Sequence, residues 1–207
     1  MNKSDVLFIL QITQSIFTIA MFVCPVLIYY LFKNKSIKGF MKYVGIYNSK
    51  KGAFFRSFKI ILFGYLFTIF VYIMLYFING KMETFPLRME YESCNSIIFI
   101  IIVILMGLRS GVGEEIFFRG WIANNLIKNI GFNKGNIIQA IIFALPHIIT
   151  FSAAPSLESI LLVCNAFVIG YCLGYIVYKE DGNTVHAIIW HGIINIIAVF
   201  IIILLFN

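Results

Sequence analysis

Charged residues are scarce in this sequence. Of its 207 residues, 12% are Asp, Glu, Lys or Arg, whereas 61% are hydrophobic and the mean hydropathy is +0.94. A soluble domain of this size carries about a quarter charged residues. The deficit excludes a water-soluble globular domain, a disordered chain and a nucleic-acid-binding domain. The sequence therefore predicts an all-α, polytopic protein embedded in the lipid bilayer.

Cysteine is also too rare to organise the fold. The chain has 4 cysteines and no CxxC pair. This excludes a disulfide framework, and we expect these side chains to be small apolar fillers.

Long uncharged runs are what the sequence does have. Each is long enough to cross a hydrocarbon core of roughly 30 Å at about 1.5 Å per residue. Five such runs predict membrane-spanning helices: Val6–Phe32, Ile60–Gly80, Gly135–Leu157, Ser159–Tyr178 and Gly182–Asn207.

The central stretch leaves two alternatives. Ser93–Leu108 is uncharged, and several charged residues then follow within a short distance. The glycines Gly107, Gly111 and Gly113 favour a break between two helices, which gives seven spans in total. One long, tilted helix with the charges near its middle is the alternative, and it gives six.

Basic residues predict the orientation. Those between the first two spans are Lys33, Lys35, Lys38, Lys42, Lys50, Lys51, Arg56 and Lys59. The positive-inside rule places this loop, residues 33–59, in the cytoplasm, with the N-terminus and the loop Lys81–Glu92 outside.

Ionisable groups at membrane depth cost about 2.5–3.5 kcal/mol each, so they need partners. Glu115 and Arg119 are four residues apart and can form an ion pair along one helix face. Glu114 points about 100° away from Glu115 and lacks an obvious local partner.

The histidines add to this set. His191 and Asn195 share a helix face, and His147 follows Pro146 inside an apolar run, whereas His186 is predicted to be interfacial. Glu114, His147 and His191 could converge as a His2Glu metal site or as an acid–base pair that activates water. Another pattern, Gly170-x-x-x-Gly174, predicts close helix packing.

These residues resemble a known family. Glu114-Glu115-Ile-Phe-Phe-Arg119, Phe143-Ala-Leu-Pro-His147 and His191-Gly-Ile-Ile-Asn195 resemble the EExxxR, FxxxH and HxxxN motifs of the CAAX-protease and bacteriocin-processing family of intramembrane proteases. The motifs occur in the family's order. The proline before His147 departs from the simple pattern and could shift the imidazole.

The resemblance implies roles for the motif residues. Glu114 would be the general base that activates water, with His147 beside it. His191 and Asn195 would act as metal ligands or oxyanion donors, and Glu115 and Arg119 would hold the first motif in place. Members are described both as zinc metalloproteases, with Glu114, His147 and His191 as the ligands here, and as metal-free glutamate-dependent proteases.

The resemblance also implies an organisation and a function. The chain would be a single membrane domain, residues 1–207, in which residues 1–95 anchor the protein and residues 96–207 form the catalytic core. It would cleave a membrane-associated protein or peptide. The Ile-, Phe-, Lys- and Asn-rich composition indicates a bacterial cytoplasmic membrane. Two alternatives stay open: a non-catalytic immunity or scaffold protein that binds a bacteriocin or peptide, and a proton pathway.

Overall fold

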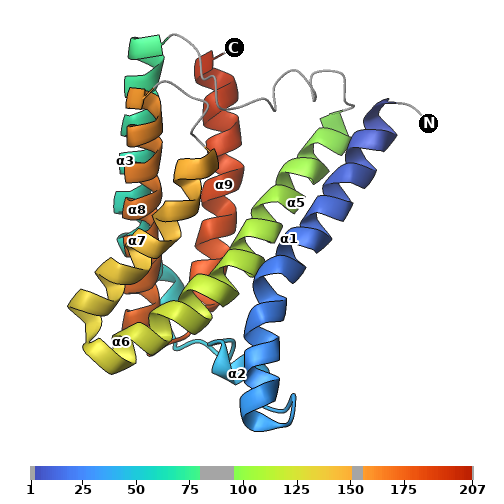
Figure 1. The fold of residues 1–207 in the computed structure, drawn as a ribbon. Coiled ribbons are helices and arrows are strands. Elements are labelled where there is room, and N and C mark those ends of the chain that lie inside the picture. Colours follow the sequence, from blue (N-terminus) through green and yellow to red (C-terminus); the bar gives the residue numbers. More distant parts are fainter. Residues whose placement is uncertain (1–2, 80–95, 151–155, 207) are drawn as a thin grey trace.

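The protein is a bundle of α-helices (Figure 1). The computed structural model describes residues 3–79, 96–150 and 156–206, and these ranges contain no β-strand. This confirms the predicted all-α polytopic fold. The described helices are α1 (Lys3–Asn34), α2 (Phe40–Tyr43), α3 (Ala53–Asn79), α5 (Ser96–Glu114), the π-helix η1 (Glu115–Ala123), α6 (Asn124–Ile130), α7 (Phe132–Thr150), α8 (Ser156–Lys179) and α9 (Val185–Phe206).

Five of the described helical stretches are long and apolar enough to cross a membrane. They are Ser4–Asn34, Ala53–Ile78, Ser96–Ile130, Leu157–Lys179 and Val185–Leu205. Their number and length make this a multi-pass membrane protein. Helix α7 is less apolar, because its first turn carries Asn133 and Lys134.

The predicted break in the central stretch is wrong. Helices α5, η1 and α6 follow one another without interruption, so that Ser96–Ile130 forms one helical stretch of 35 residues. It crosses the bundle obliquely (Figure 1). This corresponds to the alternative expectation of a single long, tilted helix in place of two spans.

The glycines that suggested a break are contact points between helices. A Cβ atom on Gly111 would lie 2.6 Å from the carbonyl oxygen of Ile188, and one on Gly107 would lie 2.7 Å from that of Gly192. Both neighbours belong to α9. Lipid offers no hydrophobic driving force between helices, so close backbone approach at small residues is what allows these two helices to associate.

The boundary between α7 and α8 also differs from the prediction. The uncharged run Gly135–Leu157 was expected to be one span, but α7 ends at Thr150 and Leu157 belongs to α8. Residues 151–155 lie outside the described part of the chain. An uncharged run therefore shows where apolar helices lie. It does not show whether the run forms one helix or belongs to two consecutive helices.

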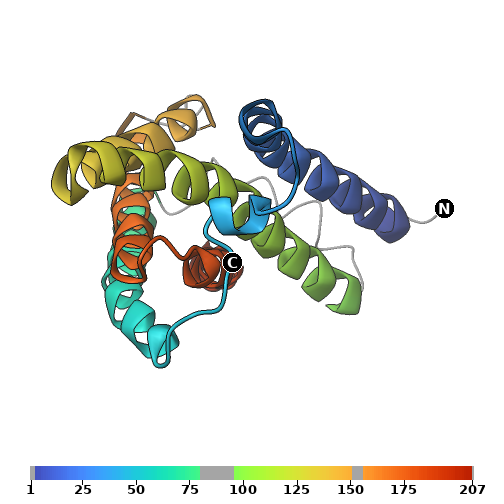
Figure 2. The same ribbon diagram turned by 90° about the horizontal axis from the view of Figure 1, so that it is seen from below.

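Close packing of α8 through its glycines is confirmed. A Cβ atom on Gly170 would lie 2.9 Å from the ring of Phe143 on α7, and one on Gly174 would overlap the side chains of Asn136 and Gln139. Helix α9 lies in the middle of the bundle, with contacts to α3, α5 and α8 (Figure 2). This arrangement brings α5, η1, α7, α8 and α9 together.

The basic loop is part of the folded structure. The Gly45 carbonyl accepts a hydrogen bond from the Thr184 backbone at 2.9 Å, and Arg56 donates two bonds of 2.9 Å to the buried carboxylate of Glu180. These contacts join the loop to the turn between α8 and α9. The side of the membrane on which this end lies stays a prediction, and the expected outer loop Lys81–Glu92 lies outside the described residues.

The glycine contact between α5 and α9 can be tested by adding a side chain. We expect Gly111→Leu to lower the thermal unfolding temperature of the detergent-solubilised protein by several degrees, because no Cβ fits against the Ile188 carbonyl. The control is Leu108→Val, on the exposed face of the same helix, which should leave it unchanged. An unchanged Gly111→Leu protein would contradict this helix contact.

Candidate active site

The first motif lies at a change of helix type. Glu114 is the last residue of α5, and Glu115 opens the π-helix η1, which ends at Ala123. π-helical turns are rare and concentrate at functional sites, because the wider turn redirects side chains. Here Glu115 and Arg119, four residues apart, both point into the protein interior and are fully buried. Nothing in the sequence analysis predicted the π-helix.

The predicted Glu115–Arg119 ion pair is confirmed. Arg119 Nη1 lies 2.6 Å from Glu115 Oε1, and Arg119 Nη2 donates to the carbonyl oxygen of Gly170 at 3.2 Å. The guanidinium group therefore joins η1 to α8. A charge-assisted hydrogen bond of this kind is strong where water is excluded.

His191 lies between the two acidic residues of the motif. Its Nδ1 atom is 2.7 Å from Glu115 Oε1, and its Nε2 atom is 4.0 Å from Glu114 Oε2. The imidazole is buried, whereas the Glu114 side chain is 19% exposed. Glu115 therefore contacts His191 directly and does more than hold its own helix in place.

The contact with Glu115 defines the hydrogen-bonding state of His191. A carboxylate paired with Arg119 only accepts hydrogen bonds, so His191 Nδ1 carries the proton and donates it. In the neutral imidazole, Nε2 then has a free lone pair and faces Glu114. The site thus presents two proton acceptors, a carboxylate and an imidazole nitrogen, toward the same small space.

His147 joins the cluster through Phe143. His147 Nδ1 lies 3.0 Å from the Phe143 carbonyl oxygen, one turn earlier on α7, so in the neutral ring Nδ1 donates and Nε2 is again an acceptor. The Phe143 ring has its centroid 5.2 Å from that of His147 and 5.8 Å from that of His191. Arg119 Cζ lies 4.1 Å from the same centroid. Pro146 does not interrupt α7.

The remaining predicted polar groups lie at different places. Asn195 is half-buried, one turn beyond His191 on α9, and its amide makes no hydrogen bond to the residues that the structure describes. His186 lies nine residues before Asn195 and packs edge-on against Phe54, with ring centroids 6.4 Å apart. It belongs to the contact between α3 and α9, outside the cluster.

The residues that the resemblance implies as zinc ligands are Glu114, His147 and His191. Their chemistry is suitable, because both imidazoles have an acceptor nitrogen and a hydrogen-bonded Nδ1, as metal-bound histidines do. Within the described ranges, however, no group of three or more His, Cys, Asp or Glu side chains is placed to hold a metal ion. Whether Glu114, His147 and His191 bind zinc stays a prediction, and we derive no reaction step through a metal.

Two buried amide side chains lie behind the site and were not predicted from the sequence. Asn136 and Gln139 are fully buried on α7. Gln139 Nε2 donates to the Gly170 carbonyl oxygen at 2.9 Å and to Asn136 Oδ1 at 2.8 Å. Gly170 therefore accepts from both Gln139 and Arg119. The available signal was their spacing of three residues within an apolar run, which puts two polar groups on one helix face.

Comparison with known proteins agrees with this constellation. A family model described as type II CAAX prenyl endopeptidase Rce1-like matches residues 96–197. The matched segment, just under half of the chain, is therefore similar to this family. No curated protein and no solved structure matches the chain significantly. The matched region contains η1, α7, α8 and most of α9, and hence every residue of the cluster around His191. This similarity supports a membrane protease in general terms.

The central ion pair predicts unequal effects of two adjacent substitutions. We expect Glu115→Gln to destabilise the protein by about 3–5 kcal/mol, because it leaves Arg119 buried and uncompensated. Glu114→Gln should cost less than about 1 kcal/mol, because Glu114 is partly exposed and forms no ion pair with an arginine. Thermal unfolding in detergent micelles measures both.

A double variant provides the control for this comparison. Glu115→Leu combined with Arg119→Met removes both charges and should recover much of the lost stability. Equal unfolding temperatures for Glu114→Gln and Glu115→Gln would contradict the assignment of Glu115 as the partner of the buried arginine.

Proposed function

We propose that the protein is an intramembrane endopeptidase that hydrolyses a peptide bond of a membrane-associated protein or peptide. The supporting observation is the position of His191, with Nδ1 bonded to Glu115 and Nε2 facing Glu114. Glu115, His191 and Glu114 thus form a row of carboxylate, neutral imidazole and carboxylate. Such a row can act as a base on water, as the hydrogen-bonded Asp-His pair of hydrolases does on its nucleophile.

The separation of the two acceptors suits a bound water molecule. At 4.0 Å, Glu114 Oε2 and His191 Nε2 are too far apart for a direct hydrogen bond, and a water placed beside both can donate one proton to each. The Oε2 atom of Glu115 is also buried without a partner among the described residues, which favours buried water nearby.

The proposed reaction conserves protons. Glu114 takes a proton from the water molecule while the water oxygen forms a bond to the substrate carbonyl carbon. The carbonyl oxygen becomes an oxyanion. When the intermediate collapses, the bond from carbon to nitrogen breaks, and the Glu114 carboxylic acid returns the proton to the leaving amine. His191, fixed by Glu115, orients the water throughout.

Asn195 is the best-suited donor for the oxyanion. Its amide has two N–H donors, and it lies one turn from His191 on the same face of α9. Neither imidazole can donate from Nε2 in the neutral form, because each carries its proton on Nδ1. Of the two residues expected as metal ligands or oxyanion donors, we therefore propose Asn195 rather than His191 as the oxyanion donor.

The site also suits access from the basic end of the bundle. His191 lies six residues beyond Val185, where α9 begins, and so about 9 Å along the helix axis from that end. We propose that this end faces the cytoplasm, because it carries the basic loop 33–59. The proposal also includes a membrane-associated substrate, a location in the bacterial cytoplasmic membrane and the binding of zinc. Metal analysis of the purified protein tests the binding of zinc.

Substitution of the base tests the proposed activity. We expect Glu114→Gln to lower the rate of substrate cleavage by at least about 10²-fold, and Asn195→Ala by about 10²–10³-fold. The measurement is mass spectrometry of new protein termini in membranes that contain the wild-type or the variant chain. Each variant should keep its thermal stability.

His186→Ala is the matched control, because this histidine lies on the same helix but packs against Phe54 outside the cluster. It should cleave at the wild-type rate. New termini that persist undiminished in Glu114→Gln would overturn the mechanism. If Glu114→Gln protected cells from a bacteriocin as well as the wild type does, the activity would be binding.

A further inference from the structure

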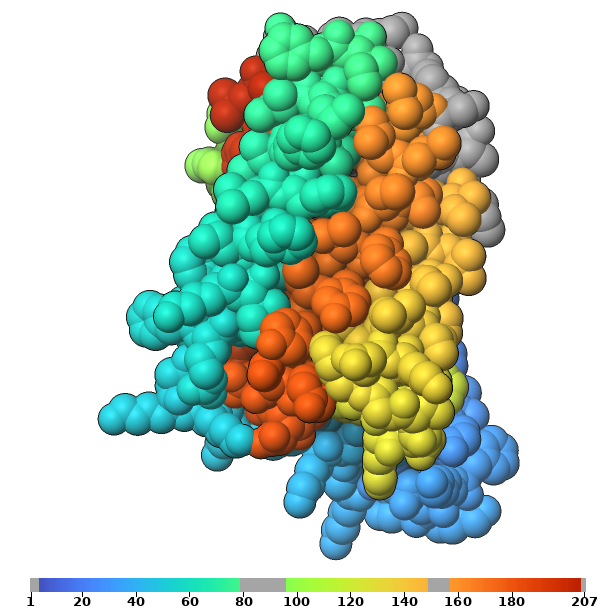
Figure 3. Space-filling view, turned by 90° about the vertical axis from the view of Figure 1, so that its left-hand side faces the viewer, coloured from blue at the N-terminus to red at the C-terminus, as the bar shows by residue number. Residues whose placement is uncertain are grey.

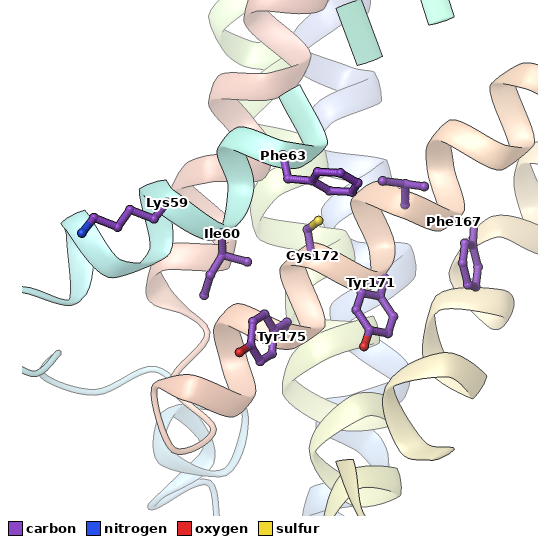
Figure 4. A pocket seen from close by; sticks show the side chains of 8 residues that line it. Lys59, Ile60, Phe63, Phe167, Tyr171, Cys172 and Tyr175 are labelled. Atoms are coloured by element: carbon purple, nitrogen blue, oxygen red, sulfur yellow. The ribbon is translucent and has the colours of Figure 1, made fainter. Parts of the chain in front are cut away.

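A cavity outside the catalytic cluster lies on the outer surface of α3 and α8. Its volume is about 450 Å³, and its lining is almost entirely apolar. Phe63 from α3 and Cys172 from α8 line it, and Lys59 and Tyr175 line it nearer the basic end of the same two helices (Figure 4). Val168 of α8 also lines it. α3 and α8 lie side by side on this face of the molecule (Figure 3).

The cavity has one polar end and one apolar end. Lys59 is six residues beyond Ala53, where α3 begins, and Tyr175 is four residues before Lys179, where α8 ends. Both therefore lie within about 9 Å of the basic end along their helices. Phe63 and Val168 lie one to two turns deeper. A phospholipid has the same arrangement, with its phosphate at the interface and its chains toward the bilayer centre.

The polar end of the cavity carries positive charge that can bind an anionic group. Lys59 is exposed and forms no ion pair with any side chain in the described ranges. Lys179 Nζ lies 5.3 Å from the ring centroid of Tyr175, beside the same opening. Tyrosine rings are typical of the membrane interface, and lysine ammonium groups there attract anionic headgroups.

We propose that this cavity is a binding site for one anionic phospholipid, with the phosphate at Lys59 and an acyl chain against Phe63, Val168 and Cys172. None of Glu114, His147, His191 or Asn195 lines the cavity. The proposal is independent of the protease activity, and either can fail without the other.

Native mass spectrometry of the full chain, released from detergent, tests the site. The probes are phosphatidylglycerol and phosphatidylcholine with identical acyl chains. We expect the wild-type protein to retain one phosphatidylglycerol with at least fivefold preference. Val168→Trp should fill the cavity and reduce retention at least tenfold. Lys59→Gln should reduce the preference for phosphatidylglycerol to less than twofold.

Two control variants are matched to these substitutions. Leu66→Trp adds the same bulk to the exposed face of α3, and Lys42→Gln removes a basic residue at the same end of the bundle. Both should retain phosphatidylglycerol as the wild type does. Lys59→Gln leaves the apolar lining intact, so it tests the proposal even if Val168→Trp does not fold.

Three outcomes would overturn the proposal. The first is equal retention of the two lipids by the wild-type protein. The second is retention of phosphatidylglycerol by a folded Val168→Trp protein. The third is displacement of the bound lipid by glycerol phosphate alone at similar concentration, because the site would then recognise only a phosphate group.

Discussion

The buried ion pair between Glu115 and Arg119 is the constraint on which the rest of the structure depends. Both side chains are fully buried in a chain that spans a membrane. A charge there is tolerated only when its partners are close and well oriented. Arg119 is satisfied by Glu115 and the Gly170 carbonyl, and Glu115 in turn bonds to His191. The need to pair one arginine thus organises three helical elements around one imidazole.

Such a network requires helix backbones to approach closely. Gly107 and Gly111 bring α5 against α9, and Gly170 and Gly174 bring α8 against α7. The same contacts set the distances within the candidate site, since Glu114 follows Gly111 by less than one turn. At Gly170 close packing and polar pairing coincide, because its carbonyl oxygen accepts hydrogen bonds from Arg119 and Gln139 that lipid could not supply.

The sequence anticipated contacts between residues close together in the chain. Glu115 and Arg119 share a helix face, and their pairing follows from a spacing of four residues. Prediction from the sequence was wrong where one pattern has two possible physical causes. Glycines within an apolar helix either end it or mark a helix contact, and only the position of α9 shows that Gly107 and Gly111 do the second. Asn136 and Gln139 were overlooked because their acceptors, the carbonyl oxygens of Tyr171 and Gly170, are distant in sequence.

The sequence by itself determined that the chain is an all-α membrane protein and that its few ionisable groups must find partners, because hydrophobic runs and charge costs are local properties. The tertiary structure decided which partners they find. In the folded protein His191 hydrogen-bonds to Glu115 and also faces Glu114. Both imidazole rings pack against the ring of Phe143. The continuous helix Ser96–Ile130, with its π-helical segment, is also a tertiary result, because packing against α9 and pairing of Arg119 favour it over a break.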